Sequence, residues 1–504
     1  MQIEPPAGVF AAAYGRGAAQ VVWTTLVADL ETPVSAFLKV GADKPLSFLL
    51  ESVEGGAVRG RYSIIGLEPD IVWRAHGAKA EINRAARQDH DAFRPCGEPP
   101  LKSLRSFINE SRFVLPEALP PMAAGVFGYL SYDMVRLMEE LPPPNPDPIG
   151  IPDAILVRPT VVIIFDSVLD TLTLVTPVRP TGLAADAALA RAVDRLTAVV
   201  EALERPLPKE PAGAAPAAVK NAQASNTSAA QFRAMVARAK DYIGAGDIFQ
   251  VVLAQRFEAP FTLPPFALYR ALRRVNPAPF LFYLDYAGFA VAGSSPEILV
   301  RTRGDTVTIR PIAGTKPRGS TPHEDKALED QLLADPKERA EHLMLLDLGR
   351  NDVGRVAAIG TVKVTDQFFV ERYSQVMHIV SNVEGKLDPR HDALDALAAG
   401  FPAGTVSGAP KVRAMEIIDE LEKEKRGLYA GCVGYFSAAG DMDSCIVLRT
   451  ALIKNGKMYV QAGAGIVADS DPDSEQQECV NKAKALFRAA EEARRFASGA
   501  GKGQ

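Results

Sequence analysis

Cysteine is scarce and scattered in this sequence of 504 residues. The four cysteines are Cys96, Cys432, Cys445 and Cys479, and no two of them form a Cys-x-x-Cys pair. This distribution argues against both a disulfide framework and a zinc site. It is typical of a protein that folds in a reducing compartment.

The sequence also lacks an excess of basic charge and any long apolar run. Its formal net charge is −5, so we expect no binding to nucleic acid. No stretch reaches the roughly 18 apolar residues that a membrane span needs, and the N-terminus carries no secretion signal pattern. We therefore expect a cytoplasmic protein that binds neither nucleic acid nor a membrane.

Two further motifs are missing. The segment 404–411 (Gly-Thr-Val-Ser-Gly-Ala-Pro-Lys) does not have the spacing of a P-loop. It is either an ordinary helix start with Pro410 in the first turn or a set of free N–H groups that meets an anion. There is no Gly-x-Cys-x-Gly nucleophile elbow, so this chain carries no glutaminase of its own.

The composition is that of a soluble globular protein, with 47% hydrophobic and 23% charged residues. The chain exceeds the length at which one core stops growing, so we expect two regions that share a large sheet core. A linker rich in Pro, Ala, Ser and Asn covers residues 206–228. The expected parts are an N-terminal region (1–222), a C-terminal domain (223–497) and a flexible tail (498–504).

After the linker, the pattern predicts short strands joined by tight turns, with helices inserted between groups of strands. Asn455-Gly456 is the strongest hairpin signal, and Ser228 is a plausible N-cap. Such short turns cannot join parallel strands, so we predict an α+β fold with largely antiparallel sheets. We expect strands that include residues 154–164 and 447–454, and helices over residues 322–333, 336–348, 391–399, 410–424 and 475–496. The charge run 422–426 is interpreted as a solvated helix face.

Two Glu-x-x-Glu pairs each open an expected helix: Glu338 with Glu341, and Glu475 with Glu478. In each pair the two side chains lie on one face, and Lys482 follows on the face of the second pair. One explanation is helix capping and favourable interaction with the helix dipole. The other is that the two pairs clamp a hard divalent cation, because Mg²⁺ takes one or two carboxylates, waters and an anionic substrate.

Three other residues each allow two interpretations. Arg449 lies in the expected strand 447–454, where it pairs with a protein carboxylate or receives a ligand carboxylate. His378 lies in an apolar stretch and is a core histidine or, if it faces a cavity, a group for proton transfer. Glu297 precedes a strand and is a surface residue or a buried acid with a raised pKa.

Together these segments resemble the chorismate-utilising enzymes, and among them most closely the anthranilate synthase large-subunit (component I) family. The resemblance covers residues 228 to about 495 densely and extends into the N-terminal half. The motifs that carry it are the segments 49–52, 60–63, 125–133, 311–315, 340–352, 404–415 and 461–467.

The resemblance implies a fold of two facing antiparallel sheets with helices outside, and Mg²⁺ bound between the glutamate pairs and the ring carboxylate of chorismate. Glu341 and Glu478 match the direct metal ligands, with Glu338 and Glu475 in support. The residues that match substrate-binding positions are Thr405, Tyr429, Arg449, Gly463, Ala464, Gly465 and Lys482.

The implied reaction is a lyase reaction, the first committed step of tryptophan biosynthesis. Ammonia adds to chorismate at C2 while the C4 hydroxyl leaves, and Glu297 matches the acid that protonates this hydroxyl. Loss of the C2 proton and of pyruvate then gives anthranilate, and His378 matches the histidine tied to this second step. The family implies that ammonia comes from glutamine through a separate amidotransferase subunit (component II), so we expect a hetero-oligomer.

Two positions discriminate within the family. Water-using members carry a lysine where this chain has Gln250, and aminodeoxychorismate synthases carry a lysine where it has Ala313. Both differences favour anthranilate formation. The alternatives are an aminodeoxychorismate synthase component, disfavoured by Ala313, and a non-catalytic tryptophan sensor.

The resemblance also implies feedback inhibition by tryptophan. The family pattern at the matching site often reads Ser-Pro-Tyr-Met, from which Ala278, Phe280 and Leu281 depart. The residues expected to bind this inhibitor are Glu51, Ser52, Pro279, Phe280 and Leu281.

Overall fold

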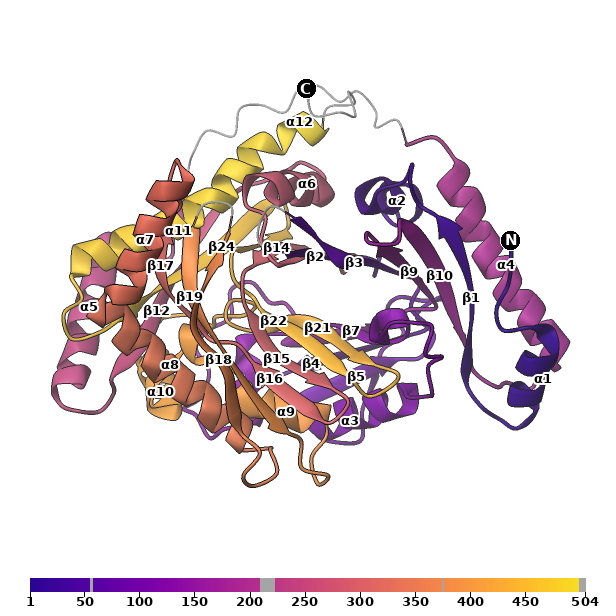
Figure 1. Ribbon diagram of the computed structural model, residues 1–504, viewed down its shortest axis with the longest axis horizontal. Coiled ribbons are helices and arrows are strands. Elements are labelled where there is room, and N and C mark those ends of the chain that lie inside the picture. Colours follow the sequence, from indigo (N-terminus) through magenta and orange to yellow (C-terminus); the bar gives the residue numbers. More distant parts are fainter. Residues whose placement is uncertain (55–57, 209–222, 374–375, 498–504) are drawn as a thin grey trace.

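The computed structural model describes residues 1–54, 58–208, 223–373 and 376–497 (Figure 1). Within them the strands form two twelve-stranded antiparallel sheets, with helices on the outer faces. This arrangement confirms the predicted α+β fold. Most of the expected linker (209–222) and the whole expected tail (498–504) lie outside the described residues.

The first sheet contains strands from both ends of the chain. Its order is β1 (Gln20–Val27), β10 (Thr171–Val178), β9 (Val161–Asp166), β3 (Val58–Leu67), β2 (Phe48–Glu54), β13 (Phe280–Asp285), β14 (Ala290–Ser295), β23 (Thr450–Lys454), β24 (Lys457–Ile466), β12 (Gln250–Pro260) and β11 (Ala224–Ser225). The short strand β20 (Gly408–Ala409) also pairs with β12.

The second sheet also contains strands from both the N-terminal and the C-terminal part of the chain. Its order is β17 (Ile312–Pro317), β19 (Val376–Lys386), β16 (Thr306–Ile309), β15 (Ile298–Arg303), β22 (Met442–Ile446), β21 (Cys432–Ser437), β7 (Gly125–Leu130), β8 (Ala154–Arg158), β4 (Ile71–His76), β5 (Lys79–Asn83) and β6 (Arg94–Pro95). Strand β18 (Lys363–Arg372) pairs with β19. Strands from before and after residue 222 are therefore hydrogen-bonded to each other in both sheets, through β2–β13 and β7–β21.

Helices cover the outer face of each sheet. Those on the side of the first sheet are α1 (Ala7–Gly15), α2 (Pro33–Val40), α4 (Ala185–Glu204), α5 (Ala229–Gly244), α6 (Pro265–Val275), α10 (Lys411–Leu421), α11 (Pro472–Glu492) and α12 (Arg494–Ala497). Those on the second sheet are α3 (Pro100–Ser111), α7 (Pro322–Ala334), α8 (Pro336–Gly354) and α9 (Ala393–Gly400). Short 3₁₀ turns are η1 (Pro121–Ala123), η2 (Tyr132–Leu137) and η3 (Gly404–Val406). None of the helices in the described ranges is long and apolar enough to cross a membrane.

A third apolar cluster lies between the two sheets and holds them face to face. Phe48 of β2 and Phe127 of β7 stack across this layer with ring centroids 4.8 Å apart. Burial of aromatic side chains from both sheets removes a large apolar area from water, and this is the main favourable term for such a sandwich.

The predicted helix cap and hairpin turn, which depend only on neighbouring residues, are confirmed. Ser228 caps α5 in a capping box with Gln231. Asn455 and Gly456 have φ of 52° and 72° and close the β23–β24 hairpin, as a two-residue turn of this type requires.

One expected strand begins later than predicted, and another is divided between the two sheets. The run 447–454 is strand only from Thr450, since β22 ends at Ile446 in the second sheet and β23 belongs to the first. The run 154–164 divides into β8 and β9. Both connections are short, with Pro159 and Thr160 between β8 and β9 and residues 447–449 between β22 and β23, and apolar residues flank each of them.

Candidate active site

The glutamate pairs lie on α8 and α11, but neither pair caps its helix through its own side chains. Asp335 caps α8 by accepting from the N–H groups of Lys337 and Glu338, and Asp471 caps α11 by accepting from Ser474. Helix α11 begins at Pro472, three residues earlier than predicted, so Glu478 lies in its second turn. The capping explanation is therefore correct for Asp335, and Glu338 and Glu475 lie in the first turns, where the helix dipole favours acidic side chains.

Glu341 of α8 lies between the two helices and touches β12. Gln250 Nε2 donates to Glu341 Oε1 over 3.1 Å. Burial raises the pKa of Glu341, and the charges of Glu338 and Glu478 raise it further. Burial also raises the pKa of Glu475, with a further increase from Glu478. Acidic side chains of both helices thus feel each other's charge, which favours a cation between them.

The glutamate carboxylates suit Mg²⁺ in chemical type and number, but they do not form a closed cage of protein ligands. Within the described ranges, no three or more His, Cys, Asp or Glu side chains converge tightly enough to hold a metal ion. Mg²⁺ keeps several waters and is usually bound by one or two carboxylates together with substrate oxygens. Glu341 and Glu478, one from each helix, meet that requirement.

The glycine stretch at the end of β24 allows close contacts with two site residues. A Cβ on Gly465 would lie 2.8 Å from Gln250 Nε2, and one on Gly463 would lie 2.7 Å from the Tyr429 hydroxyl. Lys482 donates to the Gly463 carbonyl over 2.9 Å and pairs with Glu478 at 2.6 Å. Ala464 is fully buried between the two glycines. This stretch therefore joins the expected substrate-binding and metal-binding residues.

His378 on β19 is held through one ring nitrogen and free at the other. Its Nδ1 lies 3.0 Å from the Gly314 carbonyl oxygen and 3.0 Å from Thr315 Oγ1. A carbonyl can only accept, so Nδ1 carries the proton and Nε2 keeps its lone pair. Nε2 is buried without a partner among the described residues. Burial lowers the pKa of His378 to about 4, so the ring is neutral at physiological pH.

Gly314 has φ of 78°, which presents its carbonyl to His378 at a bulge between β17 and β19. The preceding residue, Ala313, pairs in register with Ile379, the residue after His378. Ala313 thus lies next to the candidate site, where the absence of a lysine removes a nucleophile.

Glu297 is a buried acid rather than a surface residue. Its side chain is 5% exposed, and burial raises its pKa to about 8. Thr405 of η3 donates to both carboxyl oxygens, at 3.1 and 3.2 Å. A carboxyl group that is protonated at neutral pH is suited to donate a proton to a leaving group.

Arg449 lies in the connection between the sheets, with φ of 46°, rather than inside a strand. No described carboxylate is paired with its guanidinium, and burial lowers its pKa. The side chain lines a cavity of about 1240 Å³, the α11 cavity, together with Tyr373, Glu478 and Lys482. Of the two interpretations left open by the sequence, this environment favours a ligand carboxylate.

The charge run 422–426 is not a solvated helix face, contrary to the sequence interpretation. Glu422 and Arg426 are 7% and 4% exposed and form a buried ion pair at 2.6 Å. The Arg426 guanidinium lies 5.5 Å from the ring centroid of Tyr429, an expected substrate-binding residue. Lys411, at the start of α10, is also paired, with Asp352 at 2.8 Å.

All five expected inhibitor residues line a second cavity, of about 740 Å³, between the two sheets. We call this the inter-sheet cavity. The Glu51 carboxylate is already engaged there, because Arg273 donates to both of its oxygens at 2.7 and 2.9 Å and Tyr269 donates to one. A ligand in this cavity therefore meets a preformed Glu51–Arg273 pair rather than a free carboxylate.

Tyr373 is a site residue that the sequence reasoning did not identify. It lines both cavities, and its ring contacts that of His378 with centroids 5.4 Å apart. Its hydroxyl donates to Glu371 at 2.8 Å. Its place in the same segment as His378 was the available signal.

The chorismate binding enzyme family matches residues 59–488 of the chain. The chain is 58% identical over 488 residues to the protein of Cereibacter sphaeroides named anthranilate synthase component 1, and the match covers 97% of each. It is 49% identical over 467 residues to the protein of the same name from Thermus thermophilus, covering 93% of this chain and 97% of that relative.

Solved structures give the same result for the fold. Anthranilate synthase component I from Streptococcus pneumoniae superimposes with a TM-score of 0.76 at 38% identity, covering 92% of this chain and 98% of that one. The menaquinone-specific isochorismate synthase of Escherichia coli superimposes with a TM-score of 0.70. At 21% identity over 94% of this chain and 95% of that one, this second likeness shows the fold alone.

Proposed function

The chain belongs to the chorismate-binding enzymes, and from this membership we propose that it acts as the large subunit (component I) of an anthranilate synthase. It converts chorismate and ammonia into anthranilate, pyruvate and water. The proposal is carried by the similarity, over nearly the whole chain, to proteins named anthranilate synthase component 1. Gln250 supports it, because an amide bound to Glu341 cannot activate water as a lysine does.

In the first step, ammonia forms a bond to C2 of chorismate and releases one N–H proton, the ring double bonds shift, and the bond to the C4 hydroxyl breaks. Hydroxide is a poor leaving group, so Glu297 donates its proton and water departs. Thr405 holds the Glu297 carboxyl group in place through its hydroxyl. A pKa of about 8 keeps Glu297 protonated at neutral pH until it is needed.

In the second step, the aminated ring loses its C2 proton while the enolpyruvyl C–O bond at C3 breaks. The electrons of the C2–H bond complete the aromatic ring, and the released enolpyruvyl group takes a proton to become pyruvate. The lone pair of His378 Nε2 accepts the C2 proton, because Gly314 fixes the other ring nitrogen as the donor.

The substrate is a dianion, and the chain offers a cation for each carboxylate. Arg449 receives the enolpyruvyl carboxylate as a bidentate fork, with Tyr429 beside it. Lys482 and the backbone around Gly463–Gly465 hold the ring carboxylate. Glu341 and Glu478 would hold Mg²⁺, with Glu338 and Glu475 orienting its waters, and the ion would supply positive charge to neutralise that carboxylate.

Ammonia reaches this site from solution or from a glutamine amidotransferase subunit (component II), with which the chain forms a hetero-oligomer. The relatives' designation as component 1 supports a partner subunit. The protein works in the cytoplasm, as expected for a chain with this cysteine usage.

Tryptophan inhibits the enzyme by binding in the inter-sheet cavity. The support is the convergence there of Ser52, Phe280 and Leu281 from β2 and β13. Tyr373 gives that cavity a physical connection to the α11 cavity, because it lines both.

Saturating tryptophan should lower the rate of the wild type but not that of Ser52→Phe, with Ser52→Ala as the size control. Equal inhibition of the wild type and both variants contradicts tryptophan binding in the inter-sheet cavity.

A single assay tests the function. The purified chain is incubated with chorismate, Mg²⁺ and ammonium at mildly alkaline pH, and the products are followed by fluorescence and mass. Anthranilate with pyruvate supports the proposal. An amino-deoxychorismate that keeps its pyruvyl group indicates an aminodeoxychorismate synthase, and tryptophan binding without turnover indicates a sensor.

A further inference from the structure

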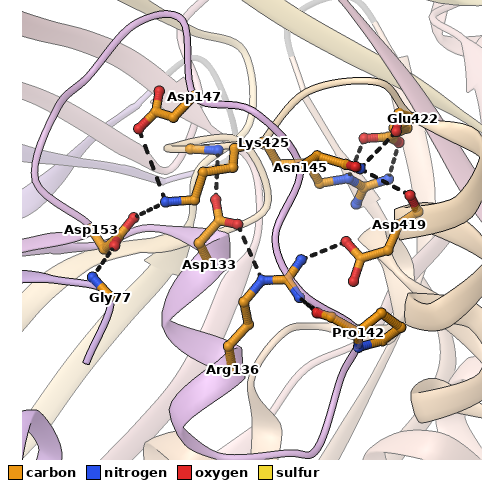
Figure 2. A network of polar contacts seen from close by, with 12 residues as sticks. Gly77, Asp133, Arg136, Pro142, Asn145, Asp147, Asp153, Asp419, Glu422 and Lys425 are labelled. Carbon is orange, nitrogen blue, oxygen red and sulfur yellow. Dashed lines mark hydrogen bonds and ion pairs between the residues drawn. The ribbon is translucent and has the colours of Figure 1, made fainter.

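The buried pair Glu422–Arg426 follows α10. The Glu422 carbonyl accepts from Asn145 in a polar network that joins the segments 133–153 and 419–427 (Figure 2). Arg426 donates to both Glu422 oxygens, at 2.9 and 2.6 Å. It also donates to the backbone carbonyls of Val406 at 2.7 Å and Val252 at 2.6 Å. A buried charge with this many partners is fully engaged and fixed in direction.

On one edge of β12, a short stretch between two partner strands has no strand beside it among the described residues. The Glu422–Arg426 pair supplies hydrogen bonds to this stretch. One edge of β12 pairs with β24 along its length. On the other edge, β20 pairs with Gln250 and Val251, and β11 pairs with Phe257 and Glu258. In the gap between them, Arg426 donates to the Val252 carbonyl and Glu422 accepts from the Ala254 N–H at 2.8 Å. Two side chains thus replace part of a strand.

The same guanidinium reaches two more parts of the candidate site. The carbonyl of Val406 belongs to η3, and the residue before it, Thr405, donates to Glu297. The flat face of Arg426 lies against the rings of Tyr132, at 4.9 Å, and Tyr429, at 5.5 Å. One side chain therefore contacts β12, η3 and Tyr429.

We propose that Arg426 is a positioning residue for the reaction: its guanidinium sets η3, β12 and Tyr429 relative to one another and so aligns the Thr405–Glu297 pair with the substrate. This inference rests on the proposed function. Only an arginine meets the three demands, because lysine can pair with Glu422 but lacks both the planar fork and the flat face. Misplacement of a catalytic group by about 1 Å can cost roughly 100-fold in rate.

The chain offers a matched control in Arg136. This arginine lies in the same network, where it pairs with Asp419 at 2.6 Å and donates to the Pro142 carbonyl (Figure 2). Among the described residues, Arg136 forms no hydrogen bond or ion pair with Thr405, Glu297 or Tyr429. Arg426→Lys and Arg136→Lys each replace an ion-paired arginine of one network, buried in the first case and partly buried in the second, but only Arg426 contacts the candidate site.

The experiment compares kcat, the chorismate KM and the melting temperature of the wild type and the two variants at saturating ammonium. We expect kcat of Arg426→Lys to fall by at least about 20-fold, with a smaller change in KM. Arg136→Lys should keep kcat within about threefold of the wild type even though its melting temperature falls, since it removes stability rather than alignment.

Equal kcat in the two variants overturns the inference, because it leaves Arg426 a purely structural role. If Arg426→Lys does not fold, Glu422→Gln/Arg426→Gln replaces it, since neutralising both partners leaves no unpaired buried charge. The double variant should also lose at least about 20-fold in kcat, and a wild-type rate contradicts the inference. A wild type that forms no anthranilate contradicts the proposed function instead, so the two failures are distinct.

Discussion

The substitution Glu297→Gln tests the buried acid directly. Glutamine has nearly the same shape and can still accept from Thr405, but it has no acid proton to give. We expect kcat to fall by about 10² to 10⁴-fold, the usual contribution of a general acid. The same substitution should change how stability depends on pH, and this second effect does not require activity.

The sign of the pH effect follows from the direction of the pKa shift. Burial raises the pKa of Glu297 from 4.5 to about 8, so between these values the folded chain holds a proton that the unfolded chain has released. The free energy of unfolding therefore falls with rising pH across this window, by about 1.4 kcal/mol per pH unit. The whole contribution is about 5 kcal/mol, and it is constant above pH 8.

The assay is denaturant unfolding of the wild type and Glu297→Gln at several pH values from 5 to 9. Subtracting the two curves cancels the other titrating groups and isolates Glu297. The wild type should lose stability relative to the variant from pH 5 to 8, and the difference should then level off. A difference that does not change with pH refutes the assignment of Glu297 as a neutral buried acid.

Three other substitutions test the remaining roles. His378→Met should still consume chorismate but release pyruvate at least about 100-fold more slowly, so that an aminated intermediate accumulates in the mass spectrum; unchanged pyruvate release removes His378 from the second step. Glu478→Gln should lower the Mg²⁺-dependent rate by at least about 100-fold, measured by titrating the metal, whereas a near-normal rate returns this glutamate to a helix-end role. Arg449→Lys should raise the chorismate KM by about 10 to 100-fold, because lysine cannot form the bidentate fork, and an unchanged KM contradicts carboxylate binding.

The parts of the fold that could be predicted depend on residues close together in the sequence. Ser228 with Gln231 forms a capping box, and Asn455-Gly456 closes a hairpin, because each needs only its own few residues. Antiparallel sheets follow from turns too short for crossovers. The glutamate pairs follow from helical spacing, and the charge of Glu478 on α11 raises the pKa of Glu341 on α8.

What could not be predicted depends on distant partners. Arg449 was placed inside a strand because the apolar run around it is unbroken, although the chain changes sheets there. Glu422 and Arg426 were interpreted as solvated, although their burial depends on β12 groups 168 and 174 positions away. Their i, i+4 spacing was visible, but it is equally common on exposed helices. Tyr373 was missed because its role comes from lining two cavities at once.

The most direct test of the central claim is the fate of nitrogen and of the enolpyruvyl group in one reaction. The purified chain is supplied with chorismate, Mg²⁺ and ¹⁵N-ammonium, and the products are quantified by mass spectrometry. We expect ¹⁵N-labelled anthranilate and pyruvate in equal amounts. A labelled product that retains the enolpyruvyl group contradicts the assignment. So does an unlabelled isomer of chorismate in which the hydroxyl group has moved to C2.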